Sequence, residues 1–188
     1  LVVRARYANE YGQPLQMGLE FDENGDPHPG NFEVFEPGEN DATGGYWVNY
    51  KPSYVSGVMQ SVSDYFYANS NGATTLNWVI TDTVNLPEAN TFYDTSGLGW
   101  HENNGTLLGD ALEAAKLAGA AKLRTDWNWE NFDGGKDLYV VLTSQAHGDY
   151  GGVAWVGSAG THCPSFTAGV VAHEFGHNLG LLHSNFWT

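Results

Sequence analysis

The sequence has few cations, a single cysteine and no long apolar run, and each shortage excludes a class of protein. Lys and Arg number 7 against 22 Asp and Glu, which gives a net charge of −15. The chain therefore lacks the basic surface that binds nucleic acid. One cysteine cannot form a disulfide within the chain, so a small disulfide-stapled scaffold is excluded. No apolar run approaches the ~18 residues that would cross a bilayer.

Length and composition instead fit one folded domain. The chain has 188 residues, of which 41% are hydrophobic and 14% aromatic, and this apolar content is too high for a disordered acidic tail. The sequence begins at Leu1 without a signal peptide and ends at Thr188 without a closing element. We therefore expect these residues to be a piece of a longer protein.

The hydrophobic pattern predicts strands and helices that are interspersed along the chain. This order predicts a single mixed α/β domain without repeats or an internal linker. The predicted strands are 1–7, 31–36, 74–84, 137–143 and 152–157, with a weaker candidate at 46–50, and residues 23–30 form a turn cluster. The predicted helices are 53–69, capped by Ser53, 106–118, and 165–179, capped by Ser165 or Thr167 and ended by Gly180.

The residues that carry chemistry lie in the run HEFGHNLGLLH, residues 173–183. His173 and His177 are four residues apart, so one face of a helix presents both imidazoles in the same direction. Imidazole nitrogen is a preferred ligand of Zn²⁺. Glu174 lies beside the first of these ligands, where it can act as a general base on a zinc-activated water without binding the metal itself.

Gly180 accounts for a third ligand, His183. A glycine in the left-handed conformation ends a helix and turns the chain back, which brings His183 toward the other two imidazoles. Three protein ligands leave one position for water, as in catalytic zinc sites, whereas a structural zinc is normally closed by four. The sequence therefore predicts one catalytic Zn²⁺ held by His173, His177 and His183.

The extended pattern resembles the metzincin zinc peptidases, and the run 171–187 (VAHEFGHNLGLLHSNFW) looks most like their gametolysin-type family. The runs 62–78 (VSDYFYANSNGATTLNW) and 151–157 (GGVAWVG) are similar to the helix, the next strand and the strand before the zinc helix in those proteins. The resemblance implies a zincin-like α/β (α+β) catalytic domain with a mixed twisted sheet and a long zinc-binding helix. Residues 1–180 would form its upper lobe, and 181–188 would begin a lower lobe that is missing.

The resemblance also implies a secreted zinc-dependent endopeptidase whose pro-segment and C-terminal region lie outside this chain. Its polypeptide substrate would lie extended along the strand just before the zinc helix, at Val153, Ala154, Trp155 and Val156. The net charge of −15 fits an extracellular enzyme that an acidic surface keeps soluble. Two alternatives stay open: a non-catalytic binding module of metzincin shape, and a zinc hydrolase of a non-peptide substrate.

Two neighbouring families share single features with the chain. Ser184, directly after the third histidine, is similar to the matrixins, and GGVAWVG followed by Cys163 resembles the adamalysins. In adamalysins a cysteine at that place pairs with one farther along the chain, which implies a partner for Cys163 outside these residues. The alternatives are a thiolate that competes for zinc and a free buried thiol.

Three further patterns each have a functional and a plain interpretation. Asp22, Asn24, Asp26 and Glu33 fit positions 1, 3, 5 and 12 of a calcium loop, but Pro27 replaces the glycine of position 6. An acidic turn is therefore the plainer interpretation, and Ca²⁺ stays an alternative there. The second pattern is His147, Asp149 and His162, which are either ligands of a structural zinc or ordinary loop residues. The third is Asn104-Gly105-Thr106, an N-glycosylation sequon that matters only in a host that glycosylates secreted proteins.

Metzincins carry a methionine turn after the third histidine, and this chain does not. Its only methionines are Met17 and Met59, both upstream. Because this floor of the zinc site is missing, we expect the isolated 188-residue chain to bind zinc weakly and to be no competent peptidase. Zinc retention and casein cleavage by the isolated chain measure this, and robust turnover would contradict the expectation.

Overall fold

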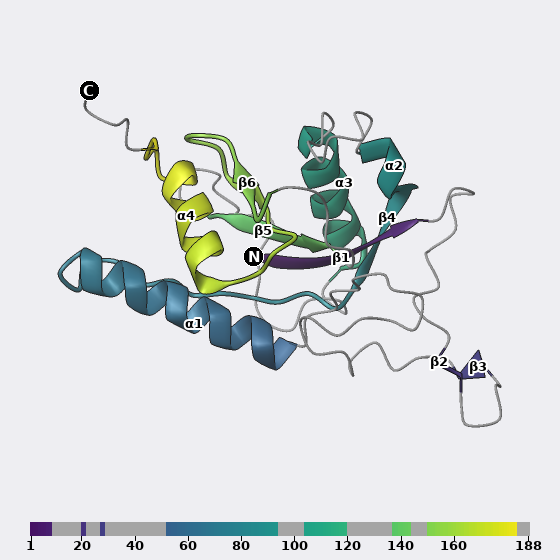
Figure 1. Cartoon of the computed structure of the whole chain (residues 1–188), viewed down its shortest axis with the longest axis horizontal. Coiled ribbons are helices and arrows are strands. Elements are labelled where there is room, and N and C mark those ends of the chain that lie inside the picture. Colours follow the sequence, from purple (N-terminus) through teal and green to yellow (C-terminus); the bar gives the residue numbers. More distant parts are fainter. Residues whose placement is uncertain are drawn as a thin grey trace.

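The computed structural model of the chain describes residues 1–8, 20–21, 27–28, 52–93, 104–119, 137–143 and 150–183. These residues form a mixed α/β fold in which one sheet lies between helices, as Figure 1 shows. The predicted α/β class is confirmed. The strands predicted at 31–36 and 46–50 and the candidate calcium loop lie outside the described residues, apart from Pro27 and its short strand.

The main sheet has four parallel strands and one antiparallel edge strand. β1 (Val2–Ala8) is paired in parallel with β4 (Val84–Ala89) and with β5 (Tyr139–Thr143). β7 (Gly160–His162) pairs in parallel with β5, and β6 (Val153–Ala154) pairs with β7 in the antiparallel direction. The resulting strand order is β4-β1-β5-β7-β6. A separate two-stranded ribbon contains β2 (Glu20–Phe21) and β3 (Pro27–His28).

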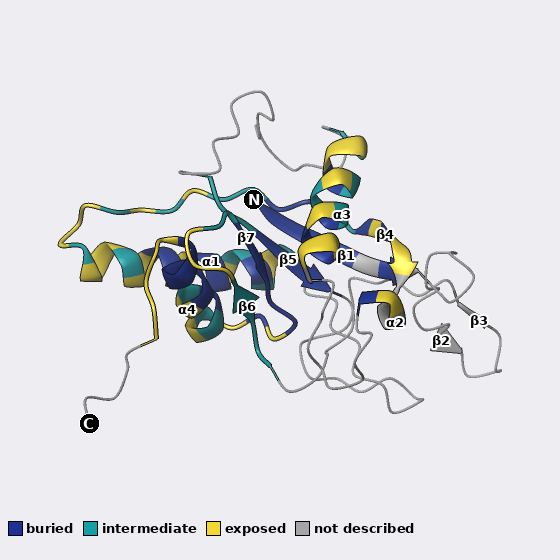
Figure 2. Ribbon diagram, turned by 90° about the horizontal axis from the view of Figure 1, so that it is seen from above, coloured by how far each residue is buried: buried dark blue, intermediate teal, exposed yellow. Residues whose placement is uncertain are grey.

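Helices cover both faces of this sheet. α3 (Asn104–Leu117) lies on one face, and α1 (Pro52–Asn69) and α4 (Ala168–Asn178) lie on the other. The short α2 (Asn90–Tyr93) follows β4 directly. The inner strands β1, β5 and β7 are the most deeply buried part of the sheet (Figure 2).

The alternation of side chains along β1 decides which helix each face of the sheet meets. Val3, Ala5 and Tyr7 are buried in one cluster with residues of α3 and β4. Val2 points the other way and is buried with residues of α1 and α4. Because both faces are covered, apolar residues are needed on both sides of the strand, as in other parallel sheets.

The strand predicted over 74–84 is wrong for most of its length. Residues 73–79 belong to no helix or strand, and Ile80 makes only an isolated bridge to Val2. Pairing begins at Val84, in β4, and this strand runs past Pro87, which the sequence pattern predicts as a stop, with an irregularity in its pairing with β1 between Asn85 and Ala89. Proline lacks the N–H of a ladder hydrogen bond but is tolerated in an edge strand, and β4 is an edge of this sheet.

Smaller differences concern the ends of other elements. α1 begins at Pro52, so Ser53 lies inside the first turn and is not its cap; proline favours this first position because its missing N–H has no partner there anyway. α4 is capped by Thr167, one of the two predicted caps. The three-residue β7 was not predicted, since Gly160–His162 offers no apolar alternation.

None of the described helices combines the length and the apolar character that a bilayer crossing requires.

Gly160 is a position where the sheet leaves no space for a side chain. A Cβ there would lie 2.6 Å from the ring of Tyr139. We predict that Gly160→Ala lowers the free energy of unfolding by about 1–3 kcal/mol, because overpacking forces ring or backbone to move. Urea unfolding measures this. The matched control is Gly109→Ala in α3, which meets nothing within 4 Å and should stabilise the chain by about 0.5–1 kcal/mol. Equal effects of the two substitutions would contradict the prediction.

Candidate metal centre

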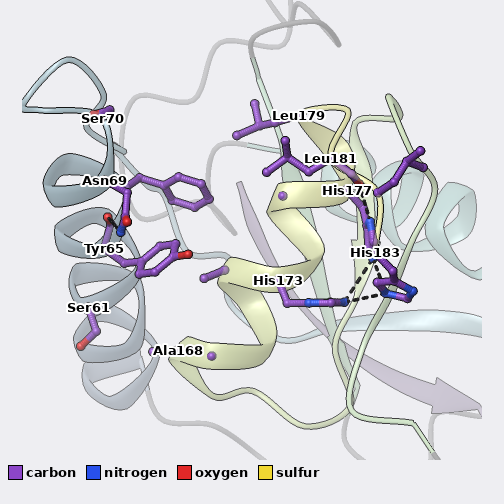
Figure 3. A pocket seen from close by; sticks show the side chains of 15 residues that line it. Ser61, Tyr65, Asn69, Ser70, Ala168, His173, His177, Leu179, Leu181 and His183 are labelled. Carbon is purple, nitrogen blue, oxygen red and sulfur yellow. Dashed lines mark hydrogen bonds between the residues drawn. The ribbon is translucent and has the colours of Figure 1, made fainter. Parts of the chain in front are cut away.

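α4 presents three different stripes of side chains. Val171 and Phe175 face the core between the helices and the sheet. Glu174 and Asn178 are buried on a second side, and His173 and His177 point away from both toward the metal centre (Figure 3). The helix begins where the Thr167 hydroxyl accepts a hydrogen bond from the N–H of Val170 at 3.4 Å, a standard N-cap.

Three imidazole nitrogens converge at the C-terminal half of this helix. The Nε2 atoms of His173 and His177 lie 3.2 Å apart, and each is 3.0 Å from Nε2 of His183. Figure 3 shows the three rings pointing toward one another. The structure therefore brings together all three of the predicted metal ligands.

The turn after α4 brings His183 next to His173 and His177. Gly180 has a φ of 94°, in the left-handed region that favours glycine. The N–H of Gly180 donates to the carbonyl of His177 and the N–H of Leu181 to that of Gly176, each at 2.9 Å. These two bonds define a Schellman motif. The helix end predicted at Gly180 is confirmed, and so is the glycine's left-handed conformation.

The same turn fixes the ring of His177. Its Nδ1 lies 2.7 Å from the carbonyl oxygen of Leu181. A carbonyl can only accept, so Nδ1 carries the proton, and the lone pair of a neutral ring is left on Nε2, toward the other two histidines. A backbone carbonyl on the second nitrogen is the usual way in which proteins orient a metal-binding histidine.

The nitrogen triangle fits a zinc ion. Nitrogens bound at about 2.0–2.1 Å in a tetrahedron lie about 3.3–3.4 Å apart, only a few tenths of an ångström wider than this triangle. Three ring lone pairs at such short range repel one another unless a proton or a cation lies among them. A donor set of three imidazole nitrogens with no thiolate suits Zn²⁺ in a catalytic rather than a closed structural site.

The triad is open to solvent on one side. His173 and His183 are exposed, whereas His177 is 8% exposed. The three rings lie at one end of a groove of about 1070 Å³ between α1 and α4. Tyr65 of α1 and Leu181 border this groove. A fourth ligand and a substrate therefore have access to the histidines.

Glu174 lies next to the triad but is turned toward the sheet edge. Its side chain is only 6% exposed, and the N–H of Ala154 in β6 donates a hydrogen bond to it. Burial raises the pKa of Glu174 above its ordinary value, and the charges of His177 and His183 and the Ala154 N–H oppose this rise. The predicted general base is therefore beside the ligands and outside the ligand triangle.

Asn178 ties the β6–β7 hairpin to the helix end. Its side-chain oxygen accepts from the hydroxyl of Thr161 at 2.7 Å, and its amide nitrogen donates to the carbonyl of Gly160 at 3.2 Å and to the hydroxyl of Ser158 at 3.3 Å. The N–H of Gly157 donates to the carbonyl of His177 at 2.9 Å. The sequence analysis missed this residue; its spacing of four from Glu174 was the available signal.

The edge strand is shorter than predicted. β6 covers only Val153 and Ala154, both half-buried, while Trp155 and Val156 are 46% and 50% exposed. Trp155 and Val156 lie outside the strand because the chain turns there: the N–H of Ser158 donates to the carbonyl of Trp155, and Gly157 has a φ of 74°. The prediction of a strand through Gly157 is therefore wrong, although all four residues lie near the helix that carries the triad.

His162, the last residue of β7, is fully buried, and so is Cys163, which follows it directly. Cys163 is a free thiol in the core beneath α1 and α4, and burial, with the nearby Glu174 charge, raises its pKa well above the ordinary value. It is not part of the histidine group, so the interpretation as a competing zinc ligand is wrong. Its pairing with a cysteine outside this chain stays a prediction.

The alternative of a structural zinc at His147, Asp149 and His162 is not supported at His162. The two ring nitrogens of His162 lie 3.2 Å from the hydroxyl of Thr143 and 3.0 Å from that of Tyr150, so neither is available to a metal. His147 and Asp149 lie outside the described residues. The sequon begins at the first residue of α3, where Gly105 and Thr106 are exposed.

Comparison of the chain with models of protein families, with curated proteins and with solved structures found no match. The interpretation of the site therefore depends on its own geometry: three converging nitrogens, a buried carboxyl group and an edge strand.

We predict that Asn178→Ala destabilises the chain by about 1–3 kcal/mol, because Thr161 and Gly160 lose their buried partner. Urea unfolding of the metal-free chain measures the change. Asn69→Ala is the control: its amide donates to the Tyr65 carbonyl at 2.7 Å on the exposed side of α1, and its effect should stay within about 0.5 kcal/mol. An equally small effect at position 178 would show that Asn178 does not hold the hairpin.

Proposed function

We propose that this chain carries the active site of a zinc-dependent endopeptidase of the metzincin type. The observation that carries the proposal is the triangle of Nε2 atoms at 3.0–3.2 Å, with a buried carboxyl group beside it and an edge strand of the sheet next to that group. His173, His177 and His183 would hold the metal. When bound, zinc supplies Lewis acidity, which makes water more acidic and polarises a substrate carbonyl.

Glu174 would serve as the general base. Its carboxylate is held next to the triad, so it can accept a proton from the attacking water and return it to the departing amine. Because the pKa of Glu174 is raised by burial, its carboxylate is a stronger base than an exposed glutamate. A carboxyl group in reach of the ligands but outside their triangle is what such proton transfer needs.

The substrate would be an extended polypeptide along β6. This strand is the outermost strand of the sheet beside α4, and an edge strand binds an extended chain through main-chain hydrogen bonds. Val153 and Ala154 would supply that backbone, and the exposed Trp155 and Val156 would contact substrate side chains beyond it. This nearby strand favours a peptide over the alternative of a non-peptide substrate.

Four features support the metzincin type in particular. The helix carries two ligands four residues apart, a left-handed glycine ends it, and the third ligand follows in the turn. The sheet is mixed, with its single antiparallel strand at the edge. In that proposal the natural protein is secreted, and further residues complete the floor of the metal site.

We predict that Glu174→Ala in the natural protein keeps its zinc but lowers peptide cleavage at least 10²-fold, because the general base is lost. His183→Ala is the matched variant and should lose metal as well, because two ligands remain. Competition with a chromogenic chelator measures zinc affinity, and cleavage of denatured casein with and without chelator measures activity. Undiminished cleavage by Glu174→Ala refutes the general-base role, and zinc binding that survives loss of His183 refutes the ligand set.

A further inference from the structure

Gly152, just before β6, faces Glu174 at a distance that leaves no space for a side chain. A Cβ at this position would lie 2.8 Å from Cγ and 3.1 Å from Oε1 of Glu174, and 2.8 Å from Cγ1 of Val170. Contacts below 3.0 Å force one partner to move. The place that a side chain of residue 152 would fill is therefore occupied by the side chain of Glu174, from Cγ to the carboxyl group, and by a methyl group of Val170.

The backbone at this position does not require glycine. Gly152 is absent from the described residues with positive φ, which include Gly157 and Gly180. An alanine would adopt the same backbone without strain. The reason for glycine at 152 is thus the close approach of α4 and not the turn.

Two residues farther along the chain, β6 holds the carboxyl group directly. The N–H of Ala154 donates a hydrogen bond to Glu174. Gly152 and Ala154 are only two residues apart, and both are in contact with the side chain of Glu174. One position gives space to the carboxyl group and the other gives it a hydrogen-bond donor.

We infer that Gly152 is a positioning residue for the general base: the missing side chain lets Glu174 lie against β6, at a fixed distance from both the metal ligands and the strand that would bind substrate. The inference rests on the proposed function. Since β6 both holds Glu174 and would pair with the peptide, a substrate in register with β6 is also in register with its general base. An enlarged residue 152 would push the carboxyl group off this strand.

A stability cycle on the metal-free chain tests the contact without any assay of activity. Val170→Ala is used as the common background, because it removes the other side chain that a Cβ at 152 would meet. In this background Gly152→Ala should raise the unfolding equilibrium constant about 5- to 30-fold. With Glu174→Ala added, the same substitution should have an effect at least fivefold smaller.

Gly151→Ala is the matched control. The atoms nearest to its Cβ would belong to Val170 and Ser165 and not to Glu174, so its effect should change less than about twofold when Glu174→Ala is added. A variant that folds only when Glu174→Ala is present also supports the inference. Equal effects of Gly152→Ala with and without Glu174, including failure to fold in both, overturn it.

Kinetics of the natural protein test the role in catalysis. Gly152→Ala should lower kcat about 10- to 100-fold, because displacement of a catalytic group by about 1 Å has this effect. KM and zinc affinity should stay within about twofold of the wild-type values, because residue 152 would contact neither the metal-binding histidines nor the substrate. Gly151→Ala should keep its kcat. A rise in KM at unchanged kcat, or a loss of zinc, overturns the positioning role.

The two proposals fail in distinguishable ways. If the wild-type natural protein binds zinc but cleaves no peptide, the proposed function is wrong, and the stability cycle still decides whether residue 152 makes space for Glu174. If the protein cleaves peptides and the cycle shows no coupling, only the inference about Gly152 is wrong.

Discussion

The packing of α4 against the β6–β7 hairpin is the constraint on which the rest of the site depends. Glu174 and Asn178 are about one helical turn apart and both face this hairpin, one toward Ala154 and the other toward Gly160 and Thr161. Because a helix turns by about 100° per residue, fixing this stripe also fixes the direction in which the histidines point. The direction of His173 and His177 on the helix is therefore set by contacts of Glu174 and Asn178, while the ring of His177 is fixed by its own hydrogen bond to the carbonyl of Leu181.

The ligands and the general base depend on different parts of the chain. The three histidines are all within residues 173–183, and the bonds that shape their turn come from the same segment. Glu174 instead needs the strand that begins some twenty residues earlier, since its donor and its free space are at Ala154 and Gly152. In the proposed function, metal binding would thus be a local property of the sequence, whereas an active geometry would require the folded sheet.

This division explains how much the sequence could predict. Local periodicity predicts β1, α1, α3, β5 and α4, and the spacing of the histidines predicts their convergence, because each follows from residues that are close in sequence. The strand expected over 74–84 is wrong because Leu76, Trp78 and Ile80 pack with α1 without forming a regular ladder, and strand pairing depends on partners far along the chain. The contact between Gly152 and Glu174 has the same long-range origin, so no pattern in either segment alone reveals it.

The two edges of the sheet are protected against pairing with another sheet in different ways. At β4, Pro87 removes a hydrogen-bond donor from the outermost strand. At β6 the outermost strand is only two residues long, and very short edge strands are poor templates for another sheet. Among the described strands, a second copy of the chain thus finds no long unbroken edge with which to form a continuous sheet, while in the proposed function a short extended segment would need only a few bonds to be held at β6. The shortness that would let β6 bind a peptide only briefly thus also protects this edge against stable pairing with another copy of the chain.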